Sequence, residues 1–579
     1  MRRFSAALLP AYLALAACWA IPFLIAPHTY PIPTFYSEFA AAICWIVFAI
    51  SVLAITWNQR AGVPRVALAP LALIVVLILQ LAIAPPLNPF FSFGAIVALL
   101  AATAITALGA RCREFPGVLT VIAVAVISGG LLTVTVELLH LFRVPNLPSA
   151  FFSMAPQGMG RRMWGNLNQP NHVGTYLAFG LAACFFLAQQ YRKWFALLAT
   201  VGLALLLGMA LTFSRVTWIY MLVIGLSAGL SLAAEARERA WTRRLLMLIG
   251  PSLLLVLAYH VCNLVTAYIN EIWALELPGS MGQRLEQGVG LRSLLWSHAW
   301  HIFLAHPWLG GGWGDYAWNQ YVQTDTLGRV EMSMNAHNIA LDLLAKVGSA
   351  GLMAVFVPLA WWAFDLCKRL RHADALFLSA LAAVMMVHSL LEYPLHYVFF
   401  LFPFAFALGY LDDKRLHIPS AGMTWVLSGV IAVCGATLVA RLWVDYRIVE
   451  RLYFTQEGMS KELARYQDSG QVLLVPYATL AMAMNAPIHY AMAPVMAAIE
   501  RQAVQIYPGP TTVQRYALAL ALQGKNEEAV TQIRRLHDQY WTNFAAETSV
   551  LREACQRNTN ELKQFCLRLK SEGLLTGSN

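Results

Sequence analysis

Residues 66–84 read Val66-Ala-Leu-Ala-Pro-Leu-Ala-Leu-Ile-Val-Val-Leu-Ile-Leu-Gln-Leu-Ala-Ile-Ala84, an almost wholly apolar run. A helix of about 20 apolar residues spans the roughly 30 Å hydrocarbon core of a bilayer, so this run predicts a transmembrane helix. Of the 579 residues, 59% are apolar and only 12% are charged, whereas soluble domains carry about 25% charged residues. The predicted fold class is therefore an all-α polytopic membrane protein.

Similar runs recur along the first 440 residues. Thirteen are expected to cross the bilayer, at about 5–26, 37–57, 66–84, 90–109, 117–139, 172–190, 194–212, 216–233, 245–264, 337–364, 374–391, 395–411 and 422–440. Their recurrence excludes a signal peptide followed by a soluble enzyme. The net charge of +10 is concentrated in short gaps between the runs. This placement is typical of membrane topology and does not indicate a nucleic-acid partner.

The basic residues in the gaps predict the orientation. One set of alternate loops holds seventeen of them, whereas the other set holds seven before the last span although its loops are longer. Because basic loops stay in the cytoplasm, the N-terminus is predicted to be cytoplasmic, in a bacterial inner membrane. Residues 1–441 would then form a transmembrane domain whose periplasmic loops lie at about 140–171 and 265–336.

After residue 441 the composition changes. Residues 442–579 have mixed charge and an amphipathic pattern, which predicts a periplasmic α-helical domain. Within it, residues 516–529 resemble one tetratricopeptide hairpin, without the repeats of a complete solenoid. Cys555 and Cys566 are the only cysteines of this segment. An oxidising compartment would allow them to pair, and two buried free thiols are the alternative.

Polar residues concentrate at the predicted outer ends of the spans. Such residues are costly in or beside hydrocarbon, so they mark candidate functional groups. The candidate active surface is therefore expected to face outward. These residues are Glu137, His140, Arg215, His337, Asn338, Asp342, His388, Glu392 and Tyr393.

His337 is the first candidate for a catalytic group. If Ser333 or Asn335 is the N-cap of the tenth span, His337 lies in the first helical turn. The positive end of the helix dipole disfavours the imidazolium there, so a neutral His337 could act as a general base. The same helix end could bind a diphosphate through its free N–H groups. The alternative is a helix-capping histidine that bonds a neighbouring loop.

Arg215 and Arg292 are the candidate phosphate ligands, because a guanidinium offers a fork of donors and keeps its charge. Arg215 lies in a tight outward turn between two spans. Arg292 begins a stretch that is expected to form an interfacial helix. The apolar residues that trace one face of this helix are at 291, 294, 295, 299, 302 and 303. The alternative for each arginine is a lipid headgroup contact, which is favoured for Arg161 and Arg162.

Other polar features are expected to be structural. Asp342 and Lys346, four residues apart, are expected to form an internal ion pair. Three glycines at 310–312 are expected to form a flexible bend rather than an anion site. Three histidines have a spacing that would admit a metal, but they lack nearby carboxylates, so no metal site is predicted. These are His298, His301 and His306.

Several of these residues fit one family pattern. His337-Asn338, followed by Gly348 and Gly351, is similar to the histidine motif of the O-antigen ligase and polymerase superfamily. Arg215 and Arg292 occupy the order of that family's other signature positions. Trp164-Gly-Asn-Leu-Asn-Gln-Pro-Asn-His-Val-Gly174 and His388-Ser-Leu-Leu-Glu-Tyr-Pro-Leu395 resemble its protein O-oligosaccharyltransferases, the pilin-glycosylating branch. The family often has an acidic residue where this chain has Lys346.

The resemblance implies a membrane glycosyltransferase of the GT-C kind. It would transfer a preassembled oligosaccharide from undecaprenyl diphosphate to Ser or Thr hydroxyls of periplasmic or pilin-like proteins, with no cofactor or metal. His337 would be the catalytic base or would orient the acceptor, while Arg215 and Arg292 would bind the diphosphate. The further substrate-binding residues would be Gln169, Asn168, Tyr393, Asn338, Arg161 and Arg162.

Two alternatives stay open at this point. The acceptor could be lipid A core, as for an O-antigen ligase, or a growing O-antigen chain, as for a polymerase. The Asn168-Gln-Pro-Asn171 segment and the large C-terminal domain favour a protein acceptor. A transporter is a more distant alternative, because the chain lacks an internal repeat and its polar residues lie at one face.

Overall fold

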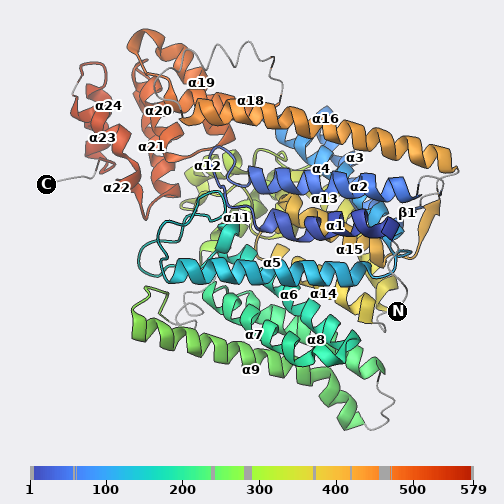
Figure 1. The fold of residues 1–579 in the computed structure, drawn as a ribbon. Coiled ribbons are helices and arrows are strands. Elements are labelled where there is room, and N and C mark those ends of the chain that lie inside the picture. The colour runs from blue at the N-terminus through green and yellow to red at the C-terminus, as the bar shows by residue number, and fades with distance from the viewer. Residues whose placement is uncertain are drawn as a thin grey trace. The chain divides into compact units, whose positions relative to one another are not determined.

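The computed structural model describes residues 6–56, 59, 62–235, 241–279, 290–368, 373–417, 420–454, 470, 473–557 and 559–575. Within these residues the regular structure is almost entirely helical (Figure 1). The apolar helices are α1 (Leu9–Ala20), α2 (Phe35–Thr56), α3 (Leu68–Ile83), α4 (Pro89–Cys112), α5 (Val118–Leu141), α6 (Pro170–Gln190), α7 (Phe195–Leu211), α8 (Thr217–Glu235), α9 (Trp241–Trp273), α13 (Ile339–Cys367), α14 (Ala373–Ser389), α15 (Val398–Leu411) and α16 (Ala421–Phe454).

The remaining elements are shorter. Two strands, β1 (Gly62–Pro64) and β2 (Arg415–His417), pair antiparallel with Val63 opposite Leu416. The other helices are α11 (Gly290–Ala305), α12 (Tyr316–Leu327), α18 (Val475–Asn485), α19 (Ala493–Ile506), α20 (Pro510–Ala521), α21 (Asn526–Gln539), α22 (Phe544–Glu547), α23 (Ser549–Gln556) and α24 (Lys563–Ser571).

The predicted fold class is confirmed: the chain is an all-α polytopic membrane protein. Among the described residues, ten helices are long and apolar enough to cross a membrane, and three shorter apolar helices cover 9–23, 373–389 and 398–411. Each of these helices coincides with one of the thirteen predicted runs. The last one, α16, continues to Phe454, beyond the predicted end at residue 440. How many of the helices cross the bilayer stays a prediction.

The chain divides into two compact units that do not follow the predicted boundary at residue 441. The first comprises residues 1–71, 98–288 and 355–439, and the second comprises residues 72–97, 289–354 and 440–579. Four helices, α3, α4, α13 and α16, contribute residues to both units. The predicted division into a transmembrane domain and a periplasmic domain stays a prediction.

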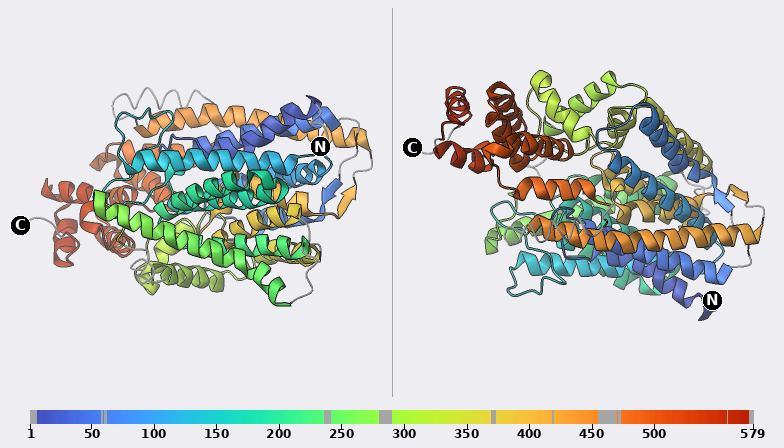
Figure 2. Two further views of the ribbon diagram at one scale, coloured as in Figure 1. Left: turned by 60° about the horizontal axis from the view of Figure 1, so that its bottom comes forward. Right: turned by 90° about the horizontal axis from the view of Figure 1, so that it is seen from above.

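In the first unit, α6 is the central helix. It packs against α5, α7, α8 and α14. The helices from α5 to α9 lie side by side in the views of Figures 1 and 2. Its side chains are mostly buried, so the helix needs no solvent-facing polar stripe. Tyr176 stacks on Phe23 with ring centroids 4.1 Å apart, and its hydroxyl donates to the Trp19 carbonyl. This packed core gives the first turn of α6 a rigid support.

In the second unit, α18 to α21 pack in sequence, each against the next. The helix α12, which the sequence placed in an outward loop, packs against α19 and α21. Its Tyr321 is fully buried in the same core as Val530 and Ile533. The Arg535 guanidinium donates to both carboxylate oxygens of Asp325, at 2.9 and 2.5 Å. The segment 316–327 therefore belongs to this helical core.

Two predictions about the C-terminal segment are confirmed. The segment 516–529 is a helical hairpin, since α20 ends at Ala521 and α21 begins at Asn526. Gly524 has a φ of +77° in the intervening turn, a conformation that favours glycine. Cys555 and Cys566 form a disulfide with a Cα–Cα distance of 5.7 Å, so the alternative of two free thiols is wrong.

Candidate active site

The predicted Asn-Gln-Pro-Asn segment forms the entry to α6. Asn168 has a left-handed φ of +54°, and Gln169 is the N-cap, because its Oε1 accepts a 2.6 Å hydrogen bond from the His172 backbone N–H. Pro170 follows at the first helical position, where its missing N–H costs nothing and its φ suits the helix. The sequence therefore places the side chains of Gln169 and Asn171 at a helix start that the backbone defines tightly.

The turn between α7 and α8 is tied to this helix start. Ser214 Oγ donates to Asn171 Oδ1 at 2.6 Å. Arg162 joins the same two segments, since its Nη2 donates to Asn171 Oδ1 at 3.1 Å and its Nε donates to the Thr212 carbonyl at 2.8 Å. Arg215, the predicted phosphate ligand, directly follows Ser214 and is half-buried. Two motifs about 40 residues apart in the chain thus share one hydrogen-bond network.

Glu392 lies at the centre of this network. Its carboxylate accepts a 2.8 Å hydrogen bond from Gln169 Nε2 and another from Asn171 Nδ2. Behind it, His388 Nε2 lies 3.3 Å from Glu392 Oε2, and His388 Nδ1 lies 2.8 Å from Thr175 Oγ1. His388 is fully buried. The sequence predicts His388 and Glu392 at a short outer turn, and Glu392 lies in the turn that follows α14.

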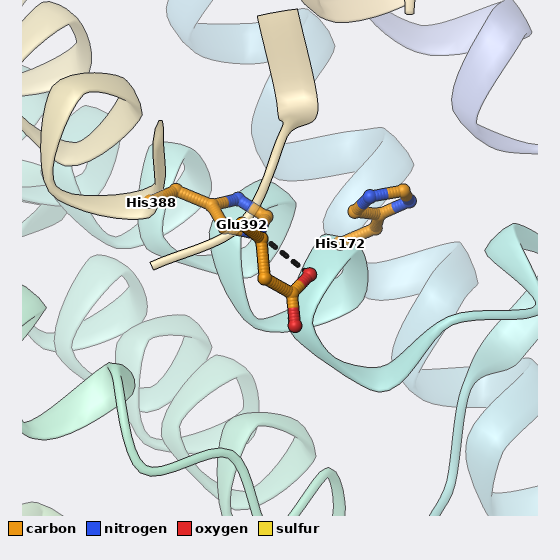
Figure 3. Close-up of side chains that lie close together, drawn as sticks. All are labelled: His172, His388 and Glu392. Carbon is orange, nitrogen blue, oxygen red and sulfur yellow. Dashed lines mark hydrogen bonds and ion pairs between the residues drawn. The ribbon is translucent and has the colours of Figure 1, made fainter. Parts of the chain in front are cut away.

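The same region contains a group with metal-ligand geometry. One ligand atom each of His172, His388 and Glu392 lies within 4.8 Å of the others. Figure 3 shows the three side chains, with a dashed line for the interaction between His388 and Glu392. Histidine and carboxylate are a usual ligand set for zinc. However, the hydrogen bonds from Gln169 and Asn171 already engage the Glu392 carboxylate. No role was predicted for His172, because an isolated histidine near the start of a span has no characteristic spacing.

Tyr393, a predicted substrate-binding residue, is half-buried beside the network. Its ring lies 5.9 Å from the rings of His396 and Tyr397. It directly follows Glu392 in the chain, so its backbone is set by the same turn. The Tyr393 side chain is therefore held among aromatic rings.

Arg161 is held differently from its neighbour Arg162. It is only 4% exposed, and its guanidinium donates to the carbonyls of Leu275, His140 and Leu141 at 2.8, 3.1 and 2.7 Å. Two of these carbonyls end α5, where the helix itself supplies no donors. The headgroup alternative for Arg161 is wrong in this structure, because burial removes the side chain from lipid. Its predicted substrate-binding role stays a prediction.

In the second unit, the helix that follows the histidine motif begins later than predicted. The N-cap of α13 is Asn338, whose Oδ1 accepts from the N–H groups of Ala340 and Leu341 at 3.0 and 3.1 Å. The prediction of Ser333 or Asn335 as N-cap is therefore wrong, since the polar side chain nearest the helix start takes that role. His337 precedes the cap with a φ of +54°, so it is not in the first helical turn. It still adjoins the positive end of the helix dipole.

Asp342 and Lys346 form the predicted internal ion pair. Lys346 Nζ lies 3.0 Å from Asp342 Oδ2, and both side chains are buried. Asp342 Oδ1 accepts a 2.8 Å hydrogen bond from the Ala336 N–H, and Lys346 Nζ donates to Asn335 Oδ1. The pair therefore anchors the residues just before His337. Lys346 has this structural task in a position where the family often has an acid.

The helix α13 is interrupted at Gly348, which has φ +67° and ψ −166°. The backbone groups near the break bond the segment 306–312, with Gly311 N–H to the Ala345 carbonyl at 2.8 Å and Ser349 N–H to the Pro307 carbonyl at 2.9 Å. A Cβ on Gly348 would overlap the Trp308 carbonyl, and one on Gly310 would overlap the Lys346 backbone. The segment 310–312 therefore packs against α13, and close backbone contact requires a glycine at position 310. Its flexibility stays a prediction.

Two buried polar residues complete this region, and no role was predicted for either of them. Gln80 on α3 donates to the carbonyls of Leu309 and Lys346 at 2.5 and 2.7 Å, which satisfies groups left free by the break. Asp315 accepts from the N–H groups of Leu87 and Asn88 at 2.6 and 3.1 Å. Burial raises the pKa of the Asp315 carboxyl, and these hydrogen bonds counteract the rise. For Gln80, the sequence did contain a signal, since it is the single glutamine in the apolar run 66–84.

Arg292 lies in the first turn of α11 and is half-buried. The predicted amphipathic face is largely confirmed, since Leu295, Ala299 and Ile302 are buried whereas Leu294 is exposed. His298 lies on the buried face, and His301 and His306 are exposed. Residue 291 lies outside the described side chains. These three histidines therefore do not share one environment.

The predicted site residues thus form two groups. Arg162, Arg215, Gln169, Asn168 and Tyr393 belong to the first unit. His337, Asn338 and Arg292 belong to the second. The meeting of Arg215 with His337 and Arg292 joins different units and stays a prediction.

Comparison with known proteins gives two family matches. Residues 200–356, which include Arg215, Arg292 and His337, match the family described as O-Antigen ligase. Residues 376–553, which include Glu392 and Tyr393, match the family described as Virulence factor membrane-bound polymerase, C-terminal. Two proteins of Acinetobacter baylyi are also similar. The "General O-oligosaccharyltransferase" is 23% identical over 93% of this chain and 94% of its own length. The "ComP-specific O-oligosaccharyltransferase" is 24% identical over 46% of each chain.

The chain is similar to O-oligosaccharyltransferases along most of its length, and one of its regions matches the O-antigen ligase family. It is therefore an enzyme, a glycosyltransferase, and the transporter alternative is not supported. Arg215, Arg292 and His337 fall within the first matched region, and Glu392 and Tyr393 fall within the second, whereas the segment 161–171 lies outside both.

Proposed function

We propose that the enzyme transfers a preassembled oligosaccharide from undecaprenyl diphosphate to Ser or Thr hydroxyls of periplasmic or pilin-like proteins. The observation that carries the acceptor class is the similarity, along 93% of the chain, to a relative named as a general O-oligosaccharyltransferase. Transfer is proposed to need no metal and to invert the anomeric carbon, because direct displacement by the hydroxyl requires no carboxylate nucleophile.

Arg215 and Arg292 are proposed to bind the diphosphate. Glycosyl transfer places negative charge on this leaving group, and guanidinium donors stabilise such charge without a metal. Arg215 adjoins a turn that hydrogen bonds hold to the start of α6, which supports a fixed position for its backbone. Gln169, Asn168, Arg161, Arg162 and Tyr393 are the proposed residues around the substrates in the first unit.

His337 is proposed as the base that assists the acceptor hydroxyl. A Ser or Thr hydroxyl is a weak nucleophile at neutral pH, and a positioned base contributes about 10²–10⁴-fold. The left-handed φ of His337 supports this role, because strained backbone persists where the surroundings over-determine it and is frequent at functional sites. Asn338, the adjacent N-cap, is proposed to contact the substrate as well.

The enzyme is proposed to lie in the bacterial inner membrane with a cytoplasmic N-terminus and periplasmic residues 442–579. The disulfide between Cys555 and Cys566 supports this side, because disulfides persist in oxidising compartments. A membrane-impermeant thiol reagent applied to spheroplasts should label these two cysteines only after reduction. Labelling that requires lysis would contradict the orientation.

A second candidate is transfer to lipid A core or to a growing O-antigen chain. The names of both matched families, a ligase and a polymerase, favour it. Purified enzyme, a defined glycan on undecaprenyl diphosphate and two acceptors, a pilin-like protein and lipid A core, separate the candidates. We expect a mass shift on the protein only, resistance to a chelator, and collapse of activity in Arg215→Ala, Arg292→Ala and His337→Ala. Transfer to lipid A core alone would reject the protein acceptor.

A further inference from the structure

Glu392 is a buried carboxylate whose hydrogen bonds reach several motifs of the first unit. It accepts from Gln169 Nε2 at 2.8 Å and from Asn171 Nδ2, the two amides that start α6. It lies on the turn after α14, more than 200 residues away in the chain. No part of the proposed chemistry uses it directly.

The charge of Glu392 matters for this arrangement. An ionised carboxylate only accepts hydrogen bonds, so both of its oxygens can face amide donors. Here Oε2 faces Gln169 and Oε1 faces Asn171. A glutamine at this position would have one acceptor oxygen and would turn its own NH₂ toward one of the two donors. Only a carboxylate therefore holds both amides in their present orientations.

The orientation of Asn171 is passed on to the turn that precedes Arg215. With Nδ2 on Glu392, Asn171 Oδ1 is free to accept from Ser214 Oγ at 2.6 Å and from Arg162 Nη2 at 3.1 Å. A reversed amide would place NH₂ against these two donors. The Arg162 Nε also holds the Thr212 carbonyl of the same turn.

Other buried groups hold Glu392 itself. His388 Nε2 lies 3.3 Å from its Oε2, and His388 Nδ1 reaches Thr175 Oγ1 at 2.8 Å. Thr175 in turn lies 2.8 Å from the Tyr220 hydroxyl. Thr175, Tyr220 and His388 are all fully buried. This series of buried contacts leaves the Glu392 carboxylate little freedom to move.

We propose that Glu392 is a positioning residue that orients Gln169 and, through Asn171 and Ser214, sets the turn that carries Arg215 toward the lipid diphosphate. The proposal rests on the proposed function in so far as Arg215 binds that diphosphate. In this proposal, Glu392 affects donor binding through other residues and not by direct contact with a substrate.

A divalent cation on His172, His388 and Glu392 is the competing use of the same atoms. The network is favoured over a cation for two reasons. Glu392 already accepts from two neutral donors, and Arg162 adds positive charge to the same network through Asn171. A dication on Glu392 would then lie two hydrogen bonds away from the Arg162 guanidinium, and the two positive charges would repel one another.

The test compares Glu392→Gln with Glu392→Asp in the full-length enzyme. Glu38→Gln is the matched control, because Glu38 is another carboxylate of the first unit and accepts one backbone bond, from Val398 at 2.8 Å, that a glutamine can keep. Kinetics are measured while the donor and the protein acceptor are varied separately. A stability measurement in detergent accompanies each variant.

We expect Glu392→Gln to lower kcat/KM by about 10- to 100-fold, the effect of losing a charge-assisted hydrogen bond. Most of the loss should fall on the KM for the donor, with the KM for the acceptor unchanged. Glu392→Asp should recover part of the activity. Glu38→Gln should stay within about twofold of the unmodified enzyme, because a glutamine oxygen can still accept the hydrogen bond from Val398. An equal loss for donor and acceptor would overturn the proposal, because it would indicate general misfolding.

Coupling gives a second readout. If Glu392 acts through Asn171 and Ser214, adding Ser214→Ala to Glu392→Gln should cost less than the two single effects multiplied, whereas Ser214→Ala with Glu38→Gln should be multiplicative. Multiplicative behaviour of the first pair would overturn the proposal. So would a transition metal found at one per chain in the unmodified enzyme, lost in Glu392→Gln, together with chelator sensitivity.

The outcome is separable from that of the proposed function. If the unmodified enzyme glycosylates lipid A core and not protein, the acceptor class fails. The ratio of Glu392→Gln to Glu392→Asp can still be measured with that acceptor and the same donor. The effect of the Glu392 variants on the KM for the donor would then decide whether Glu392 has the positioning role.

Discussion

The two groups of site residues are held in place by different means. In the first unit, side chains do so: Gln169, Asn171 and Ser214 are joined through one carboxylate, Glu392. In the second unit, backbone hydrogen bonds hold the residues in place. The residues around the break of α13 at Gly348 bond directly to the segment 306–312. Side-chain networks permit graded replacement, whereas a backbone contact through glycine permits almost none. The two regions should therefore respond differently to substitution.

The regions also share a feature. Three of the predicted motifs contain a non-glycine residue with positive φ: Asn168 at +54°, Phe213 at +48° and His337 at +54°. Such conformations cost of order 1–3 kcal/mol and persist when surrounding contacts hold them. The hydrogen bonds of Gln169, Arg162 and Asp342 adjoin these three positions. Strain and support therefore occur together in both units.

The largest effect is expected from Lys346→Met in the second unit. The substitution leaves the buried Asp342 carboxylate without its cation, which costs about 3–5 kcal/mol of stability. Asp342→Asn combined with Lys346→Met should recover much of this loss, because it removes the charge and keeps an acceptor for the Ala336 N–H. Thermal unfolding in detergent measures both variants. Equal instability of the single and the double variant would show that the loss of stability does not come from the broken ion pair.

Gly348→Ala should cost about 3 kcal/mol, since a Cβ would overlap the Trp308 carbonyl at a left-handed φ. Gly429→Ala is the control, because a Cβ there meets nothing within 4 Å on α16. The yield of folded protein and its melting temperature compare the two. A stable Gly348→Ala variant would remove the contrast between backbone and side-chain support.

Arg161→Met should cost about 2 kcal/mol in the first unit, because it takes charged donors from carbonyls at the end of α5. Arg143→Met is the control: Arg143 pairs with Glu276 at the surface, with 58% of its side chain exposed, and should change stability by less than about 1 kcal/mol. Donor kinetics decide between the two roles of Arg161. A raised donor KM at unchanged stability would favour substrate binding over helix capping.

The smallest effect is expected at Asn338. Asn338→Ala removes the N-cap of α13 and should cost about 1 kcal/mol, whereas Asn338→Ser keeps a capping oxygen and should keep the stability. Activity of the stable Asn338→Ser variant then tests substrate contact. Normal kinetics would leave Asn338 with capping alone, and a loss of activity would confirm the proposed contact.

Much of the fold could be predicted from local sequence. Hydrocarbon thickness sets a length of about 20 apolar residues, so the run at 66–84 and its counterparts marked the helices directly. The Asp342–Lys346 pair was predictable because residues four apart on a helix face each other. The N-cap was mistaken because Ser333, Asn335 and Asn338 are all good caps, and only the fold chooses among them.

The sequence by itself determined that this chain is a helical membrane protein, and it named most of the polar residues at the candidate site. Only the tertiary structure decided how those residues are supported. Glu392 meets Gln169 across 223 positions of chain, and Gln80 meets Lys346 across 266. Apolar length and helical spacing are local properties that a sequence displays. The partner of a buried amide or of a broken helix is chosen by packing between distant segments, which no local pattern encodes.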